Sequence, residues 1–191
     1  EGNLEENREF VVEYSYLHTA KHHDLDKAVG TPGVYDFDLE EQAPHIVFTP
    51  YIRALVSELT EGVDDPMEKA RRFYDFITKN MSYTFMPSYF TLENIPDTCA
   101  LNCNGDCGVL ALLFLTLCRC AGIPARWQSG LYADPNDVGS HDWAEVYSER
   151  LGWLPVDCSF GGGALRVDND ERWRFYFGNL DPWRMVANRR Y

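Results

Sequence analysis

Three side chains in the second half of the chain could together perform nucleophilic catalysis. Cys107 supplies a thiol, His141 follows 34 residues later, and Asp157 follows after a further 16. A cysteine nucleophile needs a general base, and an imidazole base needs a third group that fixes its tautomer and stabilises the imidazolium. The three residue types therefore predict a thiol nucleophile with its base and its orienting carboxylate.

The thiol of Cys107 is expected in the first turn of a buried helix. Residues 107–121 are apolar on nearly every side, Asp106 is a favourable N-cap, and Gly122 and Pro124 provide the stop signals. A helix N-terminus carries about half a positive charge and unpaired N–H groups, which stabilise a thiolate. This position therefore favours a nucleophilic role for the thiol.

His141 and Asp157 are expected on neighbouring strands of an antiparallel hairpin. Strands are predicted at residues 141–147 and 153–159, joined by the five residues 148–152. In that register His141 is a diagonal neighbour of Asp157 on one face of the sheet. A slip of one residue would place the two side chains on opposite faces, so the pairing register tests the arrangement.

The remaining segments must hold this helix and hairpin in place. Apolar residues at helical spacing predict one helix after Pro50 and a second that opens at Asp65 with Pro66. Residues 81–104 lack a helical period and are expected to form a long loop or an irregular strand. Further extended segments are expected at residues 10–16, 34–39, 125–132 and 173–177, the last followed by a turn into an aromatic, basic tail.

Several motifs together resemble the core of the transglutaminase-like superfamily. The resemblance covers roughly residues 50–160. It is carried by residues 65–83, by Asn104-Gly105-Asp106-Cys107-Gly108, by Ala121-Gly122-Ile123-Pro124-Ala125-Arg126, by His141-Asp142-Trp143-Ala144-Glu145-Val146 and by Trp153-Leu154-Pro155-Val156-Asp157.

The resemblance implies an α+β, papain-like fold in which a central buried helix carrying Cys107 packs on an antiparallel sheet carrying His141 and Asp157. It implies acyl transfer from a peptide amide or a glutamine carboxamide, through a thioester, to water or an amine. Cys107 would attack, His141 would carry the proton, and Asp157 would orient the imidazole. The oxyanion would be held by the backbone N–H of Cys107 and a side-chain donor. No position matches the family's Trp or Gln donor, and Tyr83 is the candidate here.

Hydrolysis is favoured over crosslinking, because nothing in the sequence resembles the calcium sites and extra β domains of crosslinking animal enzymes. A protease or deamidase-like activity on a peptide or protein substrate is therefore the expected function. The alternative is a non-catalytic peptide-binding or scaffold module that keeps the fold. Neither function requires a cofactor or metal, and none is predicted.

Length and charge limit the other classes of function. The 191 residues are expected to form a single domain, with an acidic extension at 1–45, a catalytic core at 46–160, and a C-terminal strand and tail at 161–191. A net charge of −13 argues against nucleic acid as a partner. The longest strongly apolar run, residues 109–117, is shorter than the roughly 20 residues that span a bilayer.

Cys99, Cys103 and Cys107 recur every four residues, which on one continuous helix would suggest a metal or cluster site. A disulfide involving Cys99 and Cys103 is favoured over a metal if the protein is exported. The sequence lacks an initiating Met and a secretory hydrophobic segment, so we expect that it begins after a removed leader or at a chosen boundary. The compartment, exported or cytoplasmic, and the oligomeric state stay open.

Overall fold

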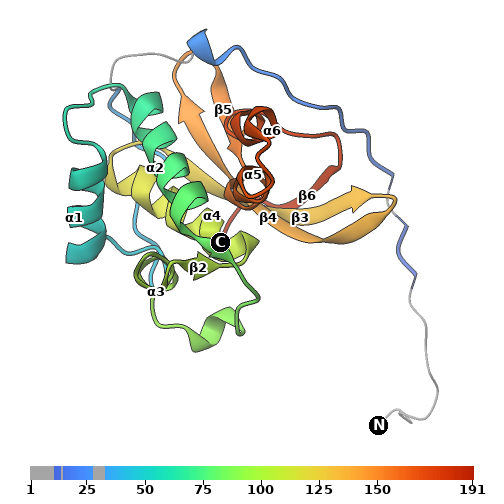
Figure 1. Cartoon of the computed structure of the whole chain (residues 1–191), viewed down its shortest axis with the longest axis horizontal. Helices are drawn as coiled ribbons and strands as arrows, with labels where there is room; N and C mark the ends of the chain where they lie inside the picture. Colours follow the sequence, from blue (N-terminus) through green and yellow to red (C-terminus); the bar gives the residue numbers. More distant parts are fainter. Residues whose placement is uncertain (1–10, 14, 28–32) are drawn as a thin grey trace.

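A computed structural model describes the chain except for residues 1–10, 14 and 28–32. Its centre is a four-stranded antiparallel sheet in the order β5-β4-β3-β6, with helices packed against it (Figure 1). The architecture is α+β, as the sequence predicts. The strands of this sheet are β3 (Ala125–Asp134), β4 (Asp137–Ser148), β5 (Gly152–Val156) and β6 (Arg184–Asn188).

Helices and short strands from the first half of the chain build the other layer. The helix that carries the thiol, α4 (Cys107–Cys120), packs on β3 and β4 and also contacts the helices α1, α2, α3 and α5 (Figure 1). The remaining elements are η1 (Leu25–Lys27), α1 (Pro50–Leu59), α2 (Pro66–Asn80), β1 (Ser82–Tyr83), η2 (Tyr89–Thr91), α3 (Ile95–Asn102), β2 (Asn104–Gly105), α5 (Cys158–Leu165) and α6 (Asp170–Phe175).

The expected helix boundaries are confirmed because each helix start has a capping side chain. At the start of α1 the Thr49 side chain accepts a hydrogen bond from the Ile52 N–H. At the start of α2 the Asp65 side chain accepts one from the Glu68 N–H. Asp106 accepts from the Val109 N–H at the start of α4, which leaves Cys107 as the first helical residue. Gly62, with φ of +70°, follows α1 where the sequence predicts a stop.

One face of the sheet forms the hydrophobic core with α4. Residues 108–119 of this helix are all buried, so it has no solvent face. Period-2 alternation directs Trp127 of β3 and Ala144 of β4 into this core. His141 and Trp143 lie on the other face of β4, where Phe160 of α5 covers them.

Two expected extended segments are wrong. Residues 81–104 include the helix α3, which Asn94 caps and which begins at Ile95; its eight residues are too few for the buried Ile95, Cys99 and Ala100 to mark a helical period in the sequence. Residues 173–177, expected as a strand, lie in and just after the helix α6. Asn169 caps α6, and acidic residues in its first turn and arginines in its last turn favour a helix through its dipole.

The strand expected at residues 153–159 ends at Val156, because Asp157 caps a new helix, α5. The strand β6 forms in the segment expected as a tail. It pairs with β3 and brings residues 184–188 to the edge of the sheet. This late strand becomes important for the candidate site.

The described part of the acidic N-terminal segment runs along the surface with little regular structure. Its Lys21 pairs with Leu180, and the Ala125 N–H donates to the Asp38 carbonyl. Of the extended stretch expected at residues 10–16, residues 10 and 14 lie outside the described residues. No helix in the described part of the chain is long and apolar enough to cross a membrane.

Candidate active site

The first turn of α4 presents Cys107 half-buried beside the end of the sheet. Gly105 forms part of β2, which pairs in parallel with β1 so that Tyr83 lies opposite Gly105. Because Cys107 follows two residues later, the pairing brings Tyr83 to the thiol. The aromatic side chain and the helix N-terminus therefore meet at the same point.

The structure places the imidazole of His141 on the carboxylate of Asp157, as the predicted register requires. Tyr147 pairs with Trp153 across the hairpin, and the His141 Nε2 lies 2.7 Å from the Asp157 Oδ2. Both side chains are buried. The Cys107 side chain lies close enough to the ring to contribute to its raised pKa. The three residues singled out in the sequence are therefore brought together in one chain of contacts.

The electrostatics of this pair favour a charged imidazole. Burial by itself lowers the pKa of His141, but the Asp157 carboxylate and the Cys107 side chain raise it to about 9. Burial likewise raises the pKa of Asp157, and the charges of His141 and Arg184 overcome that effect and hold it well below its usual range. The site is therefore built to hold an imidazolium–carboxylate pair at neutral pH.

Asp157 is fixed by more than His141. Its Oδ1 accepts from the Phe160 N–H at 2.9 Å and from the Ser159 hydroxyl at 2.8 Å, which caps α5. Its Oδ2 accepts from Arg184 at 2.7 Å as well as from His141. The Asp157 carboxylate is fully buried and held by all of these donors, so its orientation has little freedom.

Arg184 is a functional candidate that the sequence did not reveal. Its side chain is 1% exposed, and it bridges Asp157 and Asp181, each at 2.7 Å. The guanidinium also lies over the ring of Phe160, at 4.5 Å from the centroid. Arg184 is 27 residues beyond Asp157, in a segment expected only as a tail. No local motif marks it, because Asp157 is distant in the sequence and caps the helix α5.

Tyr83, the candidate oxyanion donor, lies beside the first turn of α4. Its hydroxyl lies close to the side chain and the backbone of Cys107. Burial and the neighbouring Cys107 and Asp106 raise the pKa of Tyr83 to about 12. The phenol is therefore protonated at neutral pH and can donate a hydrogen bond next to the helix N-terminus.

A second carboxylate adjoins the thiol and was also missed. The Cys107 Sγ lies 3.9 Å from the Asp142 Oδ2. Burial raises the pKa of Asp142 to about 6, against the opposing effect of the His141 charge. Tyr89 donates to the capping carboxylate of Asp106 on the same side. Asp142 follows His141 directly in the sequence, and this adjacency was the one sequence signal that could have pointed to Asp142.

The six cysteines are free thiols in the structure, so the disulfide expected at Cys99 and Cys103 is not formed. Cys99 is buried in the core, whereas Cys103 is exposed at the end of α3 with φ of 53°. In the part of the chain that the structure describes, no three His, Cys, Asp or Glu side chains gather as they would around a metal ion.

A family model for the transglutaminase-like superfamily matches residues 53–158, which include all three of Cys107, His141 and Asp157. The chain belongs to this superfamily. The strand β6 and Arg184 lie beyond the matched region.

Relatives and solved structures agree with this assignment. The chain is 29% identical over 129 residues to the uncharacterized protein YebA of Bacillus subtilis, covering 58% of this chain and 17% of the relative. It is 26% identical over 130 residues to a protein-glutamine gamma-glutamyltransferase of Pseudomonas aeruginosa, covering 62% of this chain and 20% of the relative. The chain thus spans a fifth or less of these two relatives.

The crystal structure of the periplasmic domain of TgpA from Pseudomonas aeruginosa has a similar fold. It superposes with a TM-score of 0.54 at 23% sequence identity, over 72% of this chain and 50% of that one. At this level of identity the likeness supports the papain-like, transglutaminase-like fold and leaves the reaction to be argued from the site.

Proposed function

We propose that this protein is a cysteine enzyme that transfers an acyl group from a peptide amide or a glutamine carboxamide, through a thioester, chiefly to water. Cys107 is the nucleophile, His141 the general acid and base, and Asp157 the orienting carboxylate. The observation that carries the proposal is the buried 2.7 Å contact between His141 and Asp157 beside a thiol in the first turn of a helix.

In the acylation step the Cys107 sulfur forms a bond to the carbonyl carbon of the substrate. The carbonyl oxygen becomes an oxyanion, for which the Cys107 backbone N–H and the Tyr83 hydroxyl are the donors at hand. The C–N bond then breaks, and the imidazolium of His141 gives its proton to the departing nitrogen, so that ammonia or an amine leaves. The products of this step are a thioester on Cys107 and a neutral imidazole.

In the second step His141 removes a proton from water as the water oxygen attacks the thioester. The C–S bond breaks, a carboxylic acid leaves, and the thiolate and the imidazolium are restored. An amine could replace water in the same step, giving a new amide. Asp157 keeps the imidazole in one tautomer throughout, because its Oδ2 binds the Nε2 and leaves the Nδ1 free to exchange protons.

The test is to incubate the protein with glutamine-containing peptides and follow three products: ammonia, cleaved peptide, and an incorporated fluorescent amine. Release of ammonia or of cleaved peptide, lost in Cys107→Ser and kept in Cys103→Ser, supports the proposal. Cys103→Ser is the matched control because its thiol is exposed and lies outside the site. Amine incorporation that exceeds hydrolysis would assign the transferase reaction instead.

One observation favours the non-catalytic alternative, a peptide-binding or scaffold module. The Asp142 carboxylate lies 3.9 Å from the Cys107 sulfur, and a negative charge at that distance opposes formation of a thiolate. Alkylation by iodoacetamide across pH, read by peptide mass at each cysteine, separates the two functions. If Cys107 is an activated nucleophile, its alkylation is faster than that of Cys103 at neutral pH. The alkylation of Cys107 is then slower in His141→Ala. Equal rates would favour the binding module.

A further inference from the structure

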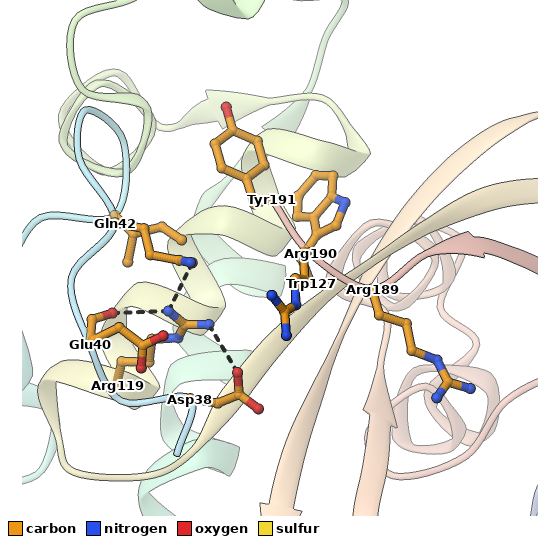
Figure 2. Close-up of a pocket in the computed structure, with 9 residues that line it drawn as sticks. Asp38, Glu40, Gln42, Arg119, Trp127, Arg189, Arg190 and Tyr191 are labelled. Atoms are coloured by element: carbon orange, nitrogen blue, oxygen red, sulfur yellow. Dashed lines mark hydrogen bonds and ion pairs between the residues drawn. The ribbon is translucent and has the colours of Figure 1, made fainter. Parts of the chain in front are cut away.

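A cavity of about 140 Å³ lies against the indole of Trp127. It is enclosed by the segment 38–46, by Arg119 near the end of α4, and by residues 189–191 (Figure 2). The Trp127 Cη2 lies 2.9 Å from the position that a β-carbon on Gly108 would occupy, and Gly108 follows Cys107. One indole ring therefore separates the cavity from the first turn of the catalytic helix.

Arg119 brings a buried positive charge to this cavity with few charged partners. Its side chain is 5% exposed and donates mainly to neutral acceptors: the Ala125 carbonyl at 2.8 Å, the Glu40 carbonyl at 2.9 Å and the Gln42 amide oxygen at 3.1 Å. In the described part of the chain, its one ion pair is with Asp38, at 3.8 Å from Nη2 (Figure 2). That distance is too long for a hydrogen bond.

The charge of Arg119 is therefore incompletely compensated. Burial lowers the pKa of this guanidinium more than the nearby Glu40 and Asp38 carboxylates raise it. A buried cation ordinarily pairs closely with an anion, since the cost of removing it from water is otherwise not offset. The Nη2 of Arg119 is thus a donor that an added anion could use.

Arg190 adds a second cation at the same cavity. Figure 2 shows its guanidinium directed toward the space between Trp127 and the segment 38–42, whereas Arg189 points away. Among the residues that the structure describes, no carboxylate forms an ion pair with the Arg190 side chain. The Glu40 carboxylate accepts from the Leu39 N–H, so it is already engaged. Two guanidinium groups thus face a cavity whose carboxylates, those of Asp38 and Glu40, make no hydrogen bond to either of them.

We propose that this cavity binds a carboxylate of the peptide substrate, as a subsite beside the amide on which Cys107 acts. A guanidinium fork matches a carboxylate in shape and charge, and the cavity is several times the volume that a water molecule occupies in the liquid, about 30 Å³. The chain carries a net charge of −13, so an acidic peptide needs such a local positive site to be held. The assignment to a substrate rests on the proposed function, whereas anion binding itself does not.

The binding test uses the intact Cys107→Ala protein, labelled with ¹⁵N, and glutarate as the probe. The Arg119 Nε–H is buried and hydrogen-bonded to the Ala125 carbonyl, so it should give a protected resonance that reports on the cavity. Glutarate should shift this resonance saturably, and methylammonium chloride at equal ionic strength should not. A shift that never saturates, or one that chloride alone reproduces, would overturn the proposal. A tighter response to inorganic phosphate than to glutarate would overturn the assignment to a carboxylate.

Two variants should move the affinity for glutarate in opposite directions. Arg190→Gln removes one cation and should weaken binding about tenfold. Asp38→Asn removes the competing carboxylate at Arg119 and should tighten binding several-fold. Arg150→Gln, an exposed arginine in the turn between β4 and β5, is the matched control and should change nothing. Equal effects of the Arg190 and Arg150 substitutions would contradict the site.

A kinetic comparison separates this proposal from the proposed function. Peptides that carry Glu beside the reacting glutamine should have a lower KM than the same peptides with a neutral residue there, and Arg190→Gln should remove the difference with little change in kcat. Glutarate binding without turnover of any peptide would keep the anion site and reject the enzymatic function. Turnover with no preference for Glu would keep the enzymatic function and reject the carboxylate subsite.

Discussion

Arg184 and His141 bind the same oxygen of Asp157, each at 2.7 Å, although the arginine comes from the last strand of the sheet. The carboxylate thus faces two cations in a site that excludes water. Each cation stabilises the ionised carboxylate, and the two cations repel each other. Arg184 therefore lowers the pKa of His141 even as it fixes the partner that raises it.

Replacing Arg184 tests this relationship. Arg184→Met leaves the carboxylates of Asp157 and Asp181 without their shared cation and should lower the free energy of unfolding by about 3–5 kcal/mol. Arg184→Lys keeps the charge but loses the fork geometry and should cost less. In urea denaturation, Arg150→Gln serves as the exposed control.

A purely structural role for Arg184 would leave the titration of His141 unchanged. We expect Arg184→Lys to keep the pKa of His141 near its present value. A folded Arg184→Met protein should instead show a higher pKa, because the repelling charge is gone. NMR titration of the imidazole measures this shift, and an unchanged pKa in Arg184→Met would contradict a positioning role.

The pH dependence of stability should carry the signature of the His141 and Asp157 pair. The folded pKa of His141, about 9, lies above the ordinary value of 6.5. Its contribution is therefore complete below pH 6.5 and is lost as the pH rises through 9, an effect on the order of 3 kcal/mol. The Asp157 pKa is lowered, so its contribution is present above pH 3.8 and is lost as the pH falls toward its folded value.

Wild type and His141→Gln should therefore differ most in unfolding free energy between about pH 4 and 6.5, and the difference should shrink toward pH 10. Urea denaturation at a series of pH values gives this comparison directly. His45→Gln provides a control, since burial lowers the pKa of His45 and its effect has the opposite sign. A difference that grows from pH 6 to 10 would show that the imidazole is buried neutral.

The sequence was informative where local signals and chemistry coincide. Capping residues and stop signals mark α1, α2 and α4, and the parity of the β4–β5 hairpin follows from the length of its loop. Cys107, His141 and Asp157 could be found because each sits in such a locally marked element. Their meeting in space then follows from a single pairing register.

The sequence was less informative where a role depends on a distant partner. Arg184 has no local pattern, because the Asp157 carboxylate that it binds lies 27 residues earlier in the chain, at the start of α5. Residues 173–177 are rich in aromatic residues, as strands often are, but the cap at Asn169 and the helix dipole favour α6. The helix α3 has only eight residues, so its buried face, which includes Ile95, Cys99 and Ala100, is too short for periodicity to detect.

Asp142 should restrain the reactivity of the thiol. Its carboxylate lies 3.9 Å from the Cys107 sulfur, and burial raises its pKa to about 6, so it is charged at neutral pH. Asp142→Asn removes that charge and keeps the shape. We expect alkylation of Cys107 at pH 7 to accelerate about tenfold, and the gain to disappear below pH 6, where Asp142 is protonated in the wild type.

Stopped-flow alkylation with iodoacetamide, read at the Cys107 peptide, measures this effect. Asp137→Asn is the control, because it removes an exposed carboxylate from the start of the same strand. A slower reaction in Asp142→Asn would mean that the carboxylate accepts the thiol proton and assists the nucleophile instead of opposing it.

The absence of a side chain at Gly108 is required by the site. A β-carbon there would lie 2.2 Å from the Tyr89 hydroxyl and 2.9 Å from both the Asp142 carboxylate and the Trp127 ring, all closer than atoms can approach. Gly108→Ala should therefore displace the groups that surround the thiol, and we expect Cys107 alkylation and turnover to fall by about tenfold or more.

Gly163→Ala is the matched control, since Gly163 also lies in a helix but has no atom within 4 Å of its β-carbon position. That substitution should raise the free energy of unfolding by roughly 0.5–1 kcal/mol through helix propensity and leave the thiol unchanged. If Gly108→Ala behaved like Gly163→Ala in both measurements, the tight packing of Tyr89, Asp142 and Trp127 around Gly108 would have no effect on the reactivity of the Cys107 thiol.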